Sequence, residues 1–257
     1  MKVAVAQFEI TPGNIEKNFN KGLAFIGEAI KKQCRLILLP EVWTTGFLFK
    51  KLKDLSIQTP EILEELKKIS KDICICGSYV VDDKSSNKVF NIFYAIDNGQ
   101  IIFEYKKTML FATTGEDKFF IPGDINQKNT FTLEDITIGV SICYELRFPE
   151  FFRKSAFRGA LIHLHPAIWP VNRLNHWLTL TAARAIENQY FLLTANGTKK
   201  SGKWELAGHS SIINPWGEII KSAYTNEDLT VSEINLDEID TVRNTITSLK
   251  DSFKVFR

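Results

Sequence analysis

Several features that fix the class of a protein on their own are missing from this 257-residue chain. Its cysteines number four and are Cys34, Cys74, Cys76 and Cys143. Their spacing fits neither a disulfide framework nor a CxxC zinc site, so we expect a reducing cytoplasm and no metal ion. No apolar run approaches the ~20 residues that cross a bilayer, and the N-terminal residues become polar too soon for a signal peptide, so no membrane partner is expected.

Neither sign of charge dominates, because 32 Lys and Arg residues stand against 30 Asp and Glu residues, a formal net charge of +2. The basic residues are scattered among acidic ones, and clusters such as Lys199, Lys200 and Lys203 are short. This pattern disfavours nucleic-acid binding and indicates solvated surfaces. Low-complexity tracts and Pro/Gly/Ser-rich linkers are also missing, so we expect residues 1–257 to form a single domain.

Short β-rich runs alternate with helical stretches from one end of the chain to the other. Strands are expected at residues 2–10, 35–39, 73–81, 91–97, 100–108, 136–142, 160–165, 190–195, 209–214 and 218–223, and helices at 14–33, 59–70 and 172–188. Asn98-Gly99 joins two of these strands and is a strong hairpin signal. The alternation predicts a layered α/β protein.

Three of the expected strands end in side chains that can do chemistry. Cys143 follows strand 136–142, Glu41 follows strand 35–39, and Lys107 lies at the end of strand 100–108. Each has a structural alternative: a buried cysteine, a helix-capping or loop carboxylate, and a surface lysine. Open α/β sheets carry their sites at the carboxyl ends of strands, so the three side chains can also converge on one site.

Together these segments resemble the nitrilase superfamily of carbon–nitrogen hydrolases over nearly the whole chain, from Val3 to Glu218. The motifs that carry the resemblance are Leu39-Pro40-Glu41, Tyr105-Lys106-Lys107, Ile142-Cys143-Tyr144, and Glu116 before Phe119-Phe120 and Pro122-Gly123. The resemblance implies a four-layer α-β-β-α sandwich and a homodimer. Whether the tail from about residue 236 contacts the partner subunit stays open.

The chemistry of this family explains the residue types. A free thiol is mostly protonated at neutral pH, so it needs a base and a cation nearby. The resemblance implies that Glu41 is the base, that Lys107 and the backbone N–H of Tyr144 hold the oxyanion, and that Glu116 orients Lys107. The expected reaction hydrolyses a small amide with water through a thioester at Cys143, without a cofactor.

Two positions depart from the family pattern, and the histidines offer a rival scheme. Met109 stands where the family often has histidine, two residues after Lys107, and Glu145 stands where aspartate is usual. His165 precedes Pro166 at a strand end, so a Cys–His pair is an alternative. We prefer a packing role for His165, because Glu41 already supplies a base.

Residues 40–47, 168–177 and 183–189 resemble the omega-amidase branch, whose substrates are dicarboxylic monoamides such as 2-oxoglutaramate and 2-oxosuccinamate. The distal carboxylate of such a substrate needs a cation, for which Arg173 is the first candidate and Arg147 the second. Aromatic walls for a small pocket are expected from Trp43, Phe111, Tyr144 and Trp169.

Two other functions stay open at this stage. One is another branch of the same superfamily that acts on deaminated glutathione or N-carbamoyl compounds. The other is a catalytically inactive binding module, which is disfavoured because Glu41, Lys107 and Cys143 are all present.

Overall fold

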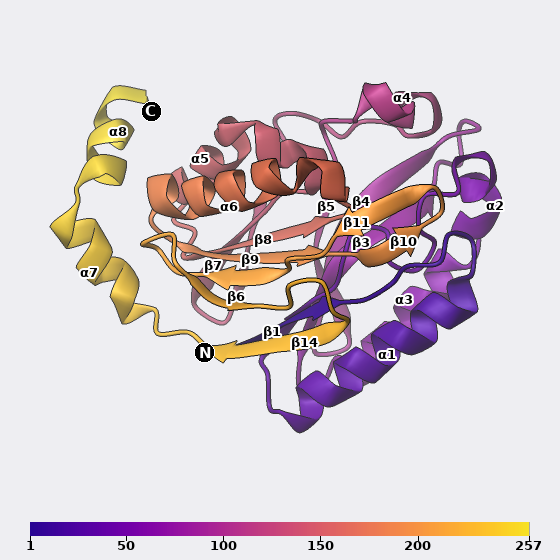
Figure 1. Cartoon of the computed structure of the whole chain (residues 1–257), viewed down its shortest axis with the longest axis horizontal. Helices are drawn as coiled ribbons and strands as arrows, with labels where there is room; N and C mark the ends of the chain where they lie inside the picture. Colours follow the sequence, from indigo (N-terminus) through magenta and orange to yellow (C-terminus); the bar gives the residue numbers. More distant parts are fainter. Residues whose placement is uncertain (257) are drawn as a thin grey trace.

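Two six-stranded β-sheets pack face to face between two layers of helices, as Figure 1 shows. The structure is a computed structural model and describes residues 1–256. The expected four-layer α-β-β-α sandwich is confirmed. Within the described residues, no helix has both the length and the apolar character to span a bilayer.

The first sheet has the strand order β14-β1-β2-β3-β4-β5. Its strands are β1 (Lys2–Gln7), β2 (Leu36–Leu38), β3 (Cys74–Asp82), β4 (Val89–Asp97), β5 (Gln100–Lys106) and β14 (Asp228–Glu233). β1, β2 and β3 run parallel, whereas β4, β5 and β14 are antiparallel to their neighbours. The hairpin expected at Asn98-Gly99 joins β4 to β5, with both residues at positive φ.

The second sheet has the strand order β13-β12-β9-β8-β7-β6. Its strands are β6 (Thr130–Leu133), β7 (Ile136–Val140), β8 (Ile162–Ala167), β9 (Phe191–Asn196), β12 (Ser211–Ile213) and β13 (Ile219–Ser222). The central strands β7, β8 and β9 are parallel. A separate two-stranded hairpin, β10 (Thr198–Ser201) with β11 (Trp204–Ala207), follows β9.

The helices cover the outer faces of the two sheets. The first sheet carries α1 (Ile15–Lys31), η1 (Phe49–Lys51), α2 (Leu52–Ser56) and α3 (Thr59–Ile69). The second carries α5 (Pro149–Phe157) and α6 (Leu174–Asn188). The shorter helical turns are η2 (Ala112–Thr114), α4 (Glu116–Phe119), η3 (Cys143–Arg147) and η4 (Val171–Arg173).

The period-2 alternation of strand side chains divides the apolar core. In β1, Val3 and Val5 face the second sheet and meet residues such as Val140, whereas Ala4 and Ala6 face the helices. Because both faces of these strands are covered, they are apolar at almost every position. The carboxyl ends of the central strands are thereby held rigidly along one edge of the sandwich.

Some elements were not expected from the sequence. These are the edge strands β6 and β14, the β10–β11 hairpin, helix α2 and the helical form of the tail. The tail consists of α7 (Asp237–Thr245) and α8 (Ser248–Phe256), which Figure 1 shows at one side of the molecule, beside the α5–α6 layer.

Candidate active site

Two strand ends and the start of a short helix bring one ammonium group between two carboxylates. Lys107 follows β5 directly, and its Nζ lies 2.8 Å from Glu41 Oε1 and 2.7 Å from Glu116 Oε1. Glu41 lies three residues after the end of β2, and Glu116 begins α4. All three side chains are buried. Because the three groups are buried, each charge depends on the others for its stability.

The lysine of this cluster is held in its charged form. Burial alone would lower the pKa of Lys107, but Glu116 and Glu41 raise it well above its ordinary value. An ammonium group has three N–H donors, and the two carboxylates accept two of them. One N–H is therefore left to donate to a further acceptor.

The carboxylate of Glu41 is fixed by hydrogen bonds from three elements. Besides Lys107, Oε1 accepts from Asn91 Nδ2 at 2.9 Å, and Oε2 accepts from the backbone N–H of Ile168 at 3.0 Å. Asn91 lies on β4 and Ile168 directly follows β8. The orientation of this carboxylate is thus set by both sheets.

The turns that carry the site have unusual backbone conformations. Cys143 has φ 47° at the turn from β7 into η3, and Val42, directly after Glu41, has φ 36°. A positive φ is uncommon for a non-glycine residue and an outlier for a β-branched one, and such strain persists where the surroundings enforce it. Ser78 Oγ accepts from the Val42 backbone N–H at 2.9 Å and helps to enforce it.

The thiol of Cys143 is neutral in the resting state. Burial raises its pKa well above the ordinary value, and the nearby Glu41 carboxylate raises it further, while Lys107 acts in the opposite direction. Its Sγ is 3.8 Å from the Ile168 carbonyl oxygen. Attack by this sulfur on an electrophile therefore requires transfer of its proton to a base, and Glu41 is close enough to influence it electrostatically.

A small cavity of about 30 Å³ opens onto Cys143. We call it the reaction pocket; its lining includes Phe111, Cys143, Tyr144, Arg147, Ile168, Trp169, Pro170, Arg173 and Trp204. Arg173 lies over the Phe111 ring at 5.2 Å, and Arg147 lies over the Trp169 ring at 4.8 Å. Within residues 1–256, neither guanidinium forms an ion pair with a carboxylate. The pocket therefore has two cations available for an anionic ligand.

The two cations influence each other. Burial lowers the pKa of Arg147, and the Arg173 charge lowers it further. An anion bound between them would relieve this repulsion.

Known proteins resemble this chain over nearly its whole length. The sequence profile described as carbon-nitrogen hydrolase matches residues 2–244. The chain belongs to the carbon–nitrogen hydrolase family. It is 36% identical over 254 residues to the 2-oxoglutaramate amidase of Bacillus subtilis (strain 168), covering 97% of this chain and 96% of that one. It is 33% identical over 256 residues to a Staphylococcus aureus protein named "Hydrolase in agr operon", covering 97% of each chain.

The fold agrees with a solved member as well. The amidase of Nesterenkonia sp. has a TM-score of 0.85 and 22% identity, covering 96% of each chain. The resemblance to the nitrilase superfamily and the enzyme class are thus confirmed for this carbon–nitrogen hydrolase.

One aromatic residue of the expected pocket wall needs correcting. In this carbon–nitrogen hydrolase, Trp43 is fully buried in the core between α1 and the first sheet, stacked on Phe19 and edge-on to Tyr79. The space for its ring comes from two glycines: a Cβ on Gly22 would lie 2.2 Å from the indole and one on Gly77 would lie 3.2 Å from it. Phe111, Tyr144 and Trp169 do line the reaction pocket.

Glu145, one of the departures from the family pattern, ties the lysine loop to the cysteine turn. Its Oε1 accepts from the Thr108 backbone N–H at 2.7 Å and from Tyr105 Oη at 2.9 Å, and its Oε2 accepts from the Ile142 backbone N–H at 2.7 Å. Burial raises the pKa of Glu145 to about 7, against these donors, which lower it. Glutamate, one methylene longer than the usual aspartate, makes these contacts to both the lysine loop and the cysteine turn.

Arg184 fastens α6 to the turn that follows the cysteine. Its Nη2 and Nε donate to the Leu146 carbonyl oxygen at 2.8 and 3.2 Å, and its Nη1 lies 3.0 Å from Glu187 Oε1. The i, i+3 spacing on α6 accounts for the pair with Glu187, whereas the contact with η3 depends on tertiary packing.

The histidines lie behind the site or at its rim. Ser141 Oγ lies 2.8 Å from both His163 Nε2 and His165 Nδ1, and both rings are buried. Burial, then the charge of Lys107, lowers the pKa of His165 to about 3. His165 is therefore neutral at physiological pH. Within residues 1–256, His, Cys, Asp and Glu form no cluster of three that could hold a metal ion.

Proposed function

We propose that this protein is a thiol-dependent amidase that hydrolyses the terminal amide of a small dicarboxylic monoamide to the acid and ammonia. One observation carries the proposal: the buried Glu41–Lys107–Glu116 cluster lies beside a neutral thiol, in a pocket whose two guanidiniums form no ion pair with a carboxylate of residues 1–256. The cluster suits attack on a carbonyl group, and the guanidiniums suit the far end of an acidic substrate.

In the first half of the reaction, Glu41 takes the proton from Cys143 Sγ as the sulfur attacks the amide carbonyl carbon. The tetrahedral oxyanion accepts the remaining N–H of Lys107 and the backbone N–H of Tyr144. One such donor is typically worth about 3–4 kcal/mol of the barrier. Glu41 then returns the proton to the nitrogen, the C–N bond breaks, and ammonia leaves a thioester on Cys143.

In the second half, Glu41 removes a proton from water, whose oxygen attacks the thioester carbon. The same two donors hold the second oxyanion. The C–S bond then breaks, the thiol regains its proton, and the acid is released. Glu116 acts as a positioning residue, because its contact at 2.7 Å and the contact of Glu41 at 2.8 Å hold the Lys107 ammonium from two sides.

The substrate class follows from the other end of the pocket. Arginine can hold a carboxylate with two parallel hydrogen bonds, so we assign the distal carboxylate to Arg173, with Arg147 beside it. The B. subtilis relative is named 2-oxoglutaramate amidase, which supports a five-carbon oxo-monoamide, and 2-oxosuccinamate has the same two ends.

The test is ammonia release from 2-oxoglutaramate, 2-oxosuccinamate, a neutral amide of similar length, an N-carbamoyl amino acid and a nitrile. For deaminated glutathione, whose amide nitrogen does not leave as ammonia, the release of cysteinylglycine is measured instead. We expect the oxo-monoamides to have the highest kcat/KM and Cys143→Ala to remove all turnover; Cys34→Ala is the matched control. A higher kcat/KM for deaminated glutathione or the N-carbamoyl compound would assign the protein to another branch of the nitrilase superfamily. No turnover of any compound by folded wild-type protein would favour a binding module.

Arg173→Met and Arg147→Met separate the two guanidiniums. Loss of Arg173 should raise KM for the acidic amides steeply and leave the neutral amide nearly unchanged. Equal losses on acidic and neutral amides would mean that Arg173 supports its loop, and the assignment would pass to Arg147.

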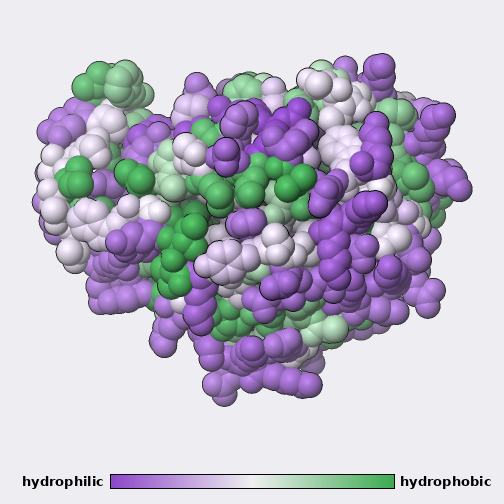
Figure 2. Space-filling view, in the orientation of Figure 1, coloured by the Kyte–Doolittle hydropathy of each residue, from purple (hydrophilic) through white to green (hydrophobic). Residues whose placement is uncertain are grey.

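We also propose that the protein is a homodimer that joins through the α5–α6 layer. Figure 2 shows apolar side chains gathered on this face of the molecule. Exposed apolar residues of α6, β13 and the turn before β13 are Ile186, Trp216, Ile219 and Ile220, and the tail adds Ile246, Val255 and Phe256. Large exposed apolar patches mark interfaces.

The oligomeric state can be measured by light scattering. Ile186→Glu should give a monomer, whereas Ile57→Glu, a matched change at another exposed isoleucine, should leave the dimer intact. A wild-type monomer at micromolar concentration would contradict the proposal.

Four free cysteines agree with the proposed reducing cytoplasm, and the proposed single domain spans residues 1–257.

A further inference from the structure

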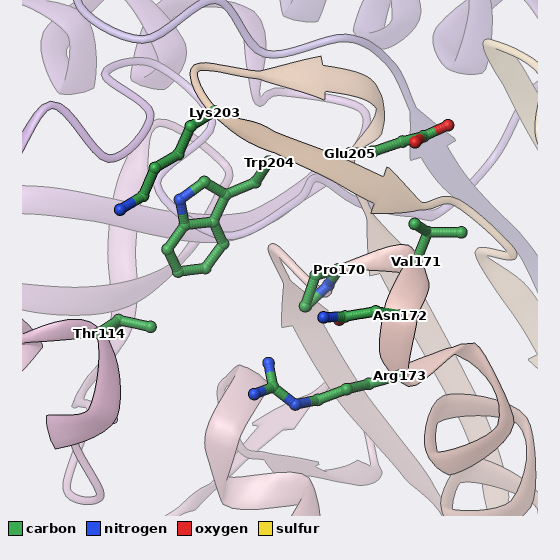
Figure 3. Close-up of a pocket in the computed structure, with 8 residues that line it drawn as sticks. All are labelled: Thr114, Pro170, Val171, Asn172, Arg173, Lys203, Trp204 and Glu205. Carbon is green, nitrogen blue, oxygen red and sulfur yellow. The ribbon is translucent and has the colours of Figure 1, made fainter.

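Three cavities meet at one side chain, that of Trp204. The reaction pocket, of about 30 Å³, lies on one side. An outer pocket of about 360 Å³, drawn in Figure 3, and an aromatic cleft of about 520 Å³ also have Trp204 in their lining. The outer pocket is lined by Thr114, Pro170, Val171, Asn172, Arg173, Lys203, Trp204 and Glu205. Removal of the indole would therefore join a very small cavity to much larger ones.

The backbone that carries Trp204 is fixed independently of its side chain. Trp204 begins β11, and two residues later Leu206 pairs with Pro170 in an isolated bridge. The Ala207 backbone N–H donates to the Trp169 carbonyl oxygen at 2.8 Å. The hairpin is thus bound through main-chain contacts to the segment that walls the reaction pocket. A smaller side chain at Trp204 would therefore remove the wall between the cavities and leave the hairpin bound to the 169–170 segment.

We propose that Trp204 determines the length of the acyl chain that this enzyme accepts. The inference rests on the proposed amidase function and adds a specificity-determining residue to it. With the indole present, the chain that follows the reacting carbonyl must fit between Cys143 and the wall formed by Trp204, so only short monoamides reach the thiol. The chemistry at the carbonyl is the same for every chain length.

The outer pocket is suited to the carboxylate of a longer chain. In Figure 3 the indole projects from the hairpin between Lys203 and Pro170, and the Arg173 guanidinium extends into the same region from η4. Two cations, Lys203 and Arg173, line this pocket against one carboxylate, Glu205. Arg173 also lines the reaction pocket, so Lys203 is the cation that belongs to the outer pocket and not to the reaction pocket.

The experiment compares ammonia release from succinamate, glutaramate, adipamate and suberamate, which differ only in chain length. In Trp204→Ala, kcat/KM for suberamate relative to succinamate should rise by at least about tenfold, the discrimination that pocket size commonly provides. Trp204→Phe should fall between wild type and Trp204→Ala. Trp216→Ala, a matched change at the β12–β13 turn, should keep the wild-type ratio.

A second variant tests the outer pocket. In the Trp204→Ala background, Lys203→Met should reduce kcat/KM for suberamate but not for octanamide, its neutral analogue, while Lys200→Met on the same hairpin should affect neither. An unchanged chain-length ratio in both Trp204 variants would overturn the proposal, provided that wild type hydrolyses succinamate. Wild type that hydrolyses no monoamide would instead refute the amidase function itself.

Discussion

Lys107→Met removes the one positive charge of the buried cluster and keeps most of the aliphatic stem. Glu41 and Glu116 then lose an ammonium partner at 2.8 and 2.7 Å, and both remain buried. Removal of one partner from a buried ion pair typically costs about 3–5 kcal/mol. Loss of one oxyanion donor typically lowers kcat by about 10²–10³. At pH 8 we therefore expect Lys107→Met to lower the free energy of unfolding by about 3–5 kcal/mol. We also expect it to lower kcat by about 10²–10³.

The loss of stability should depend on pH with a definite sign. Burial raises the pKa of Glu116 and the Lys107 charge opposes this, so loss of Lys107 should raise the folded-state pKa of Glu116 further above the unfolded value of ~4.3. A group with a raised folded pKa loses its contribution to stability as pH rises from the unfolded pKa toward the folded one. The deficit in free energy of unfolding relative to wild type should therefore be smaller at pH 5 than at pH 8.

Urea denaturation at the two pH values and an ammonia-release assay measure these effects. Lys106→Met is the matched control, because the Lys106 ammonium lies over the Phe90 ring at 4.5 Å, outside the cluster. It should change kcat and stability little. The reasoning is refuted if Lys107→Met keeps kcat within about twofold of wild type, or if its stability deficit is the same at pH 5 and pH 8.

Three further predictions concern the groups around the thiol. Glu41→Gln should lower kcat by about 10²–10⁴, and mass spectrometry that still detected rapid acylation of Cys143 would identify another base. Glu145→Gln should have a lower free energy of unfolding than wild type, and the difference should be smaller at pH 8 than at pH 5. The reason is that the pKa of Glu145 is raised to about 7, so wild type loses stability as pH rises through this range. Urea denaturation that showed a constant difference would contradict this. Arg184→Met should lower the free energy of unfolding by about 1–3 kcal/mol, because the buried Leu146 carbonyl loses its donors, and an unchanged urea midpoint would contradict it.

The sequence predicted those parts of the site that lie at the ends of strong strand patterns. Glu41, Lys107 and Cys143 each follow an apolar run, and the parallel arrangement of β2 with its neighbours and of β7 with β8 brings such ends to one edge. The register that carries their side chains into contact is a property of the two packed sheets. No local pattern expresses it.

Other parts of the site depend on partners that are remote in sequence. Trp43 follows Glu41 closely, as a pocket residue would, yet the missing side chain of Gly22 on α1 decides that its ring enters the core. Trp204 lies on a short hairpin rich in lysine, where alternation is too brief to reveal a strand. Glu145 was visible only as a departure from the family pattern, because its three backbone donors come from two separate turns.

The raised pKa of the Cys143 thiol has a consequence for the enzyme between turnovers. Peroxides and alkylating electrophiles react with thiolates far faster than with thiols. The resting cluster carries two carboxylates and one ammonium beside the sulfur, which disfavours a second negative charge there. Under the proposed mechanism, nucleophilic sulfur forms only while a carbonyl group is present to receive it, and we expect the idle enzyme to react slowly with peroxides.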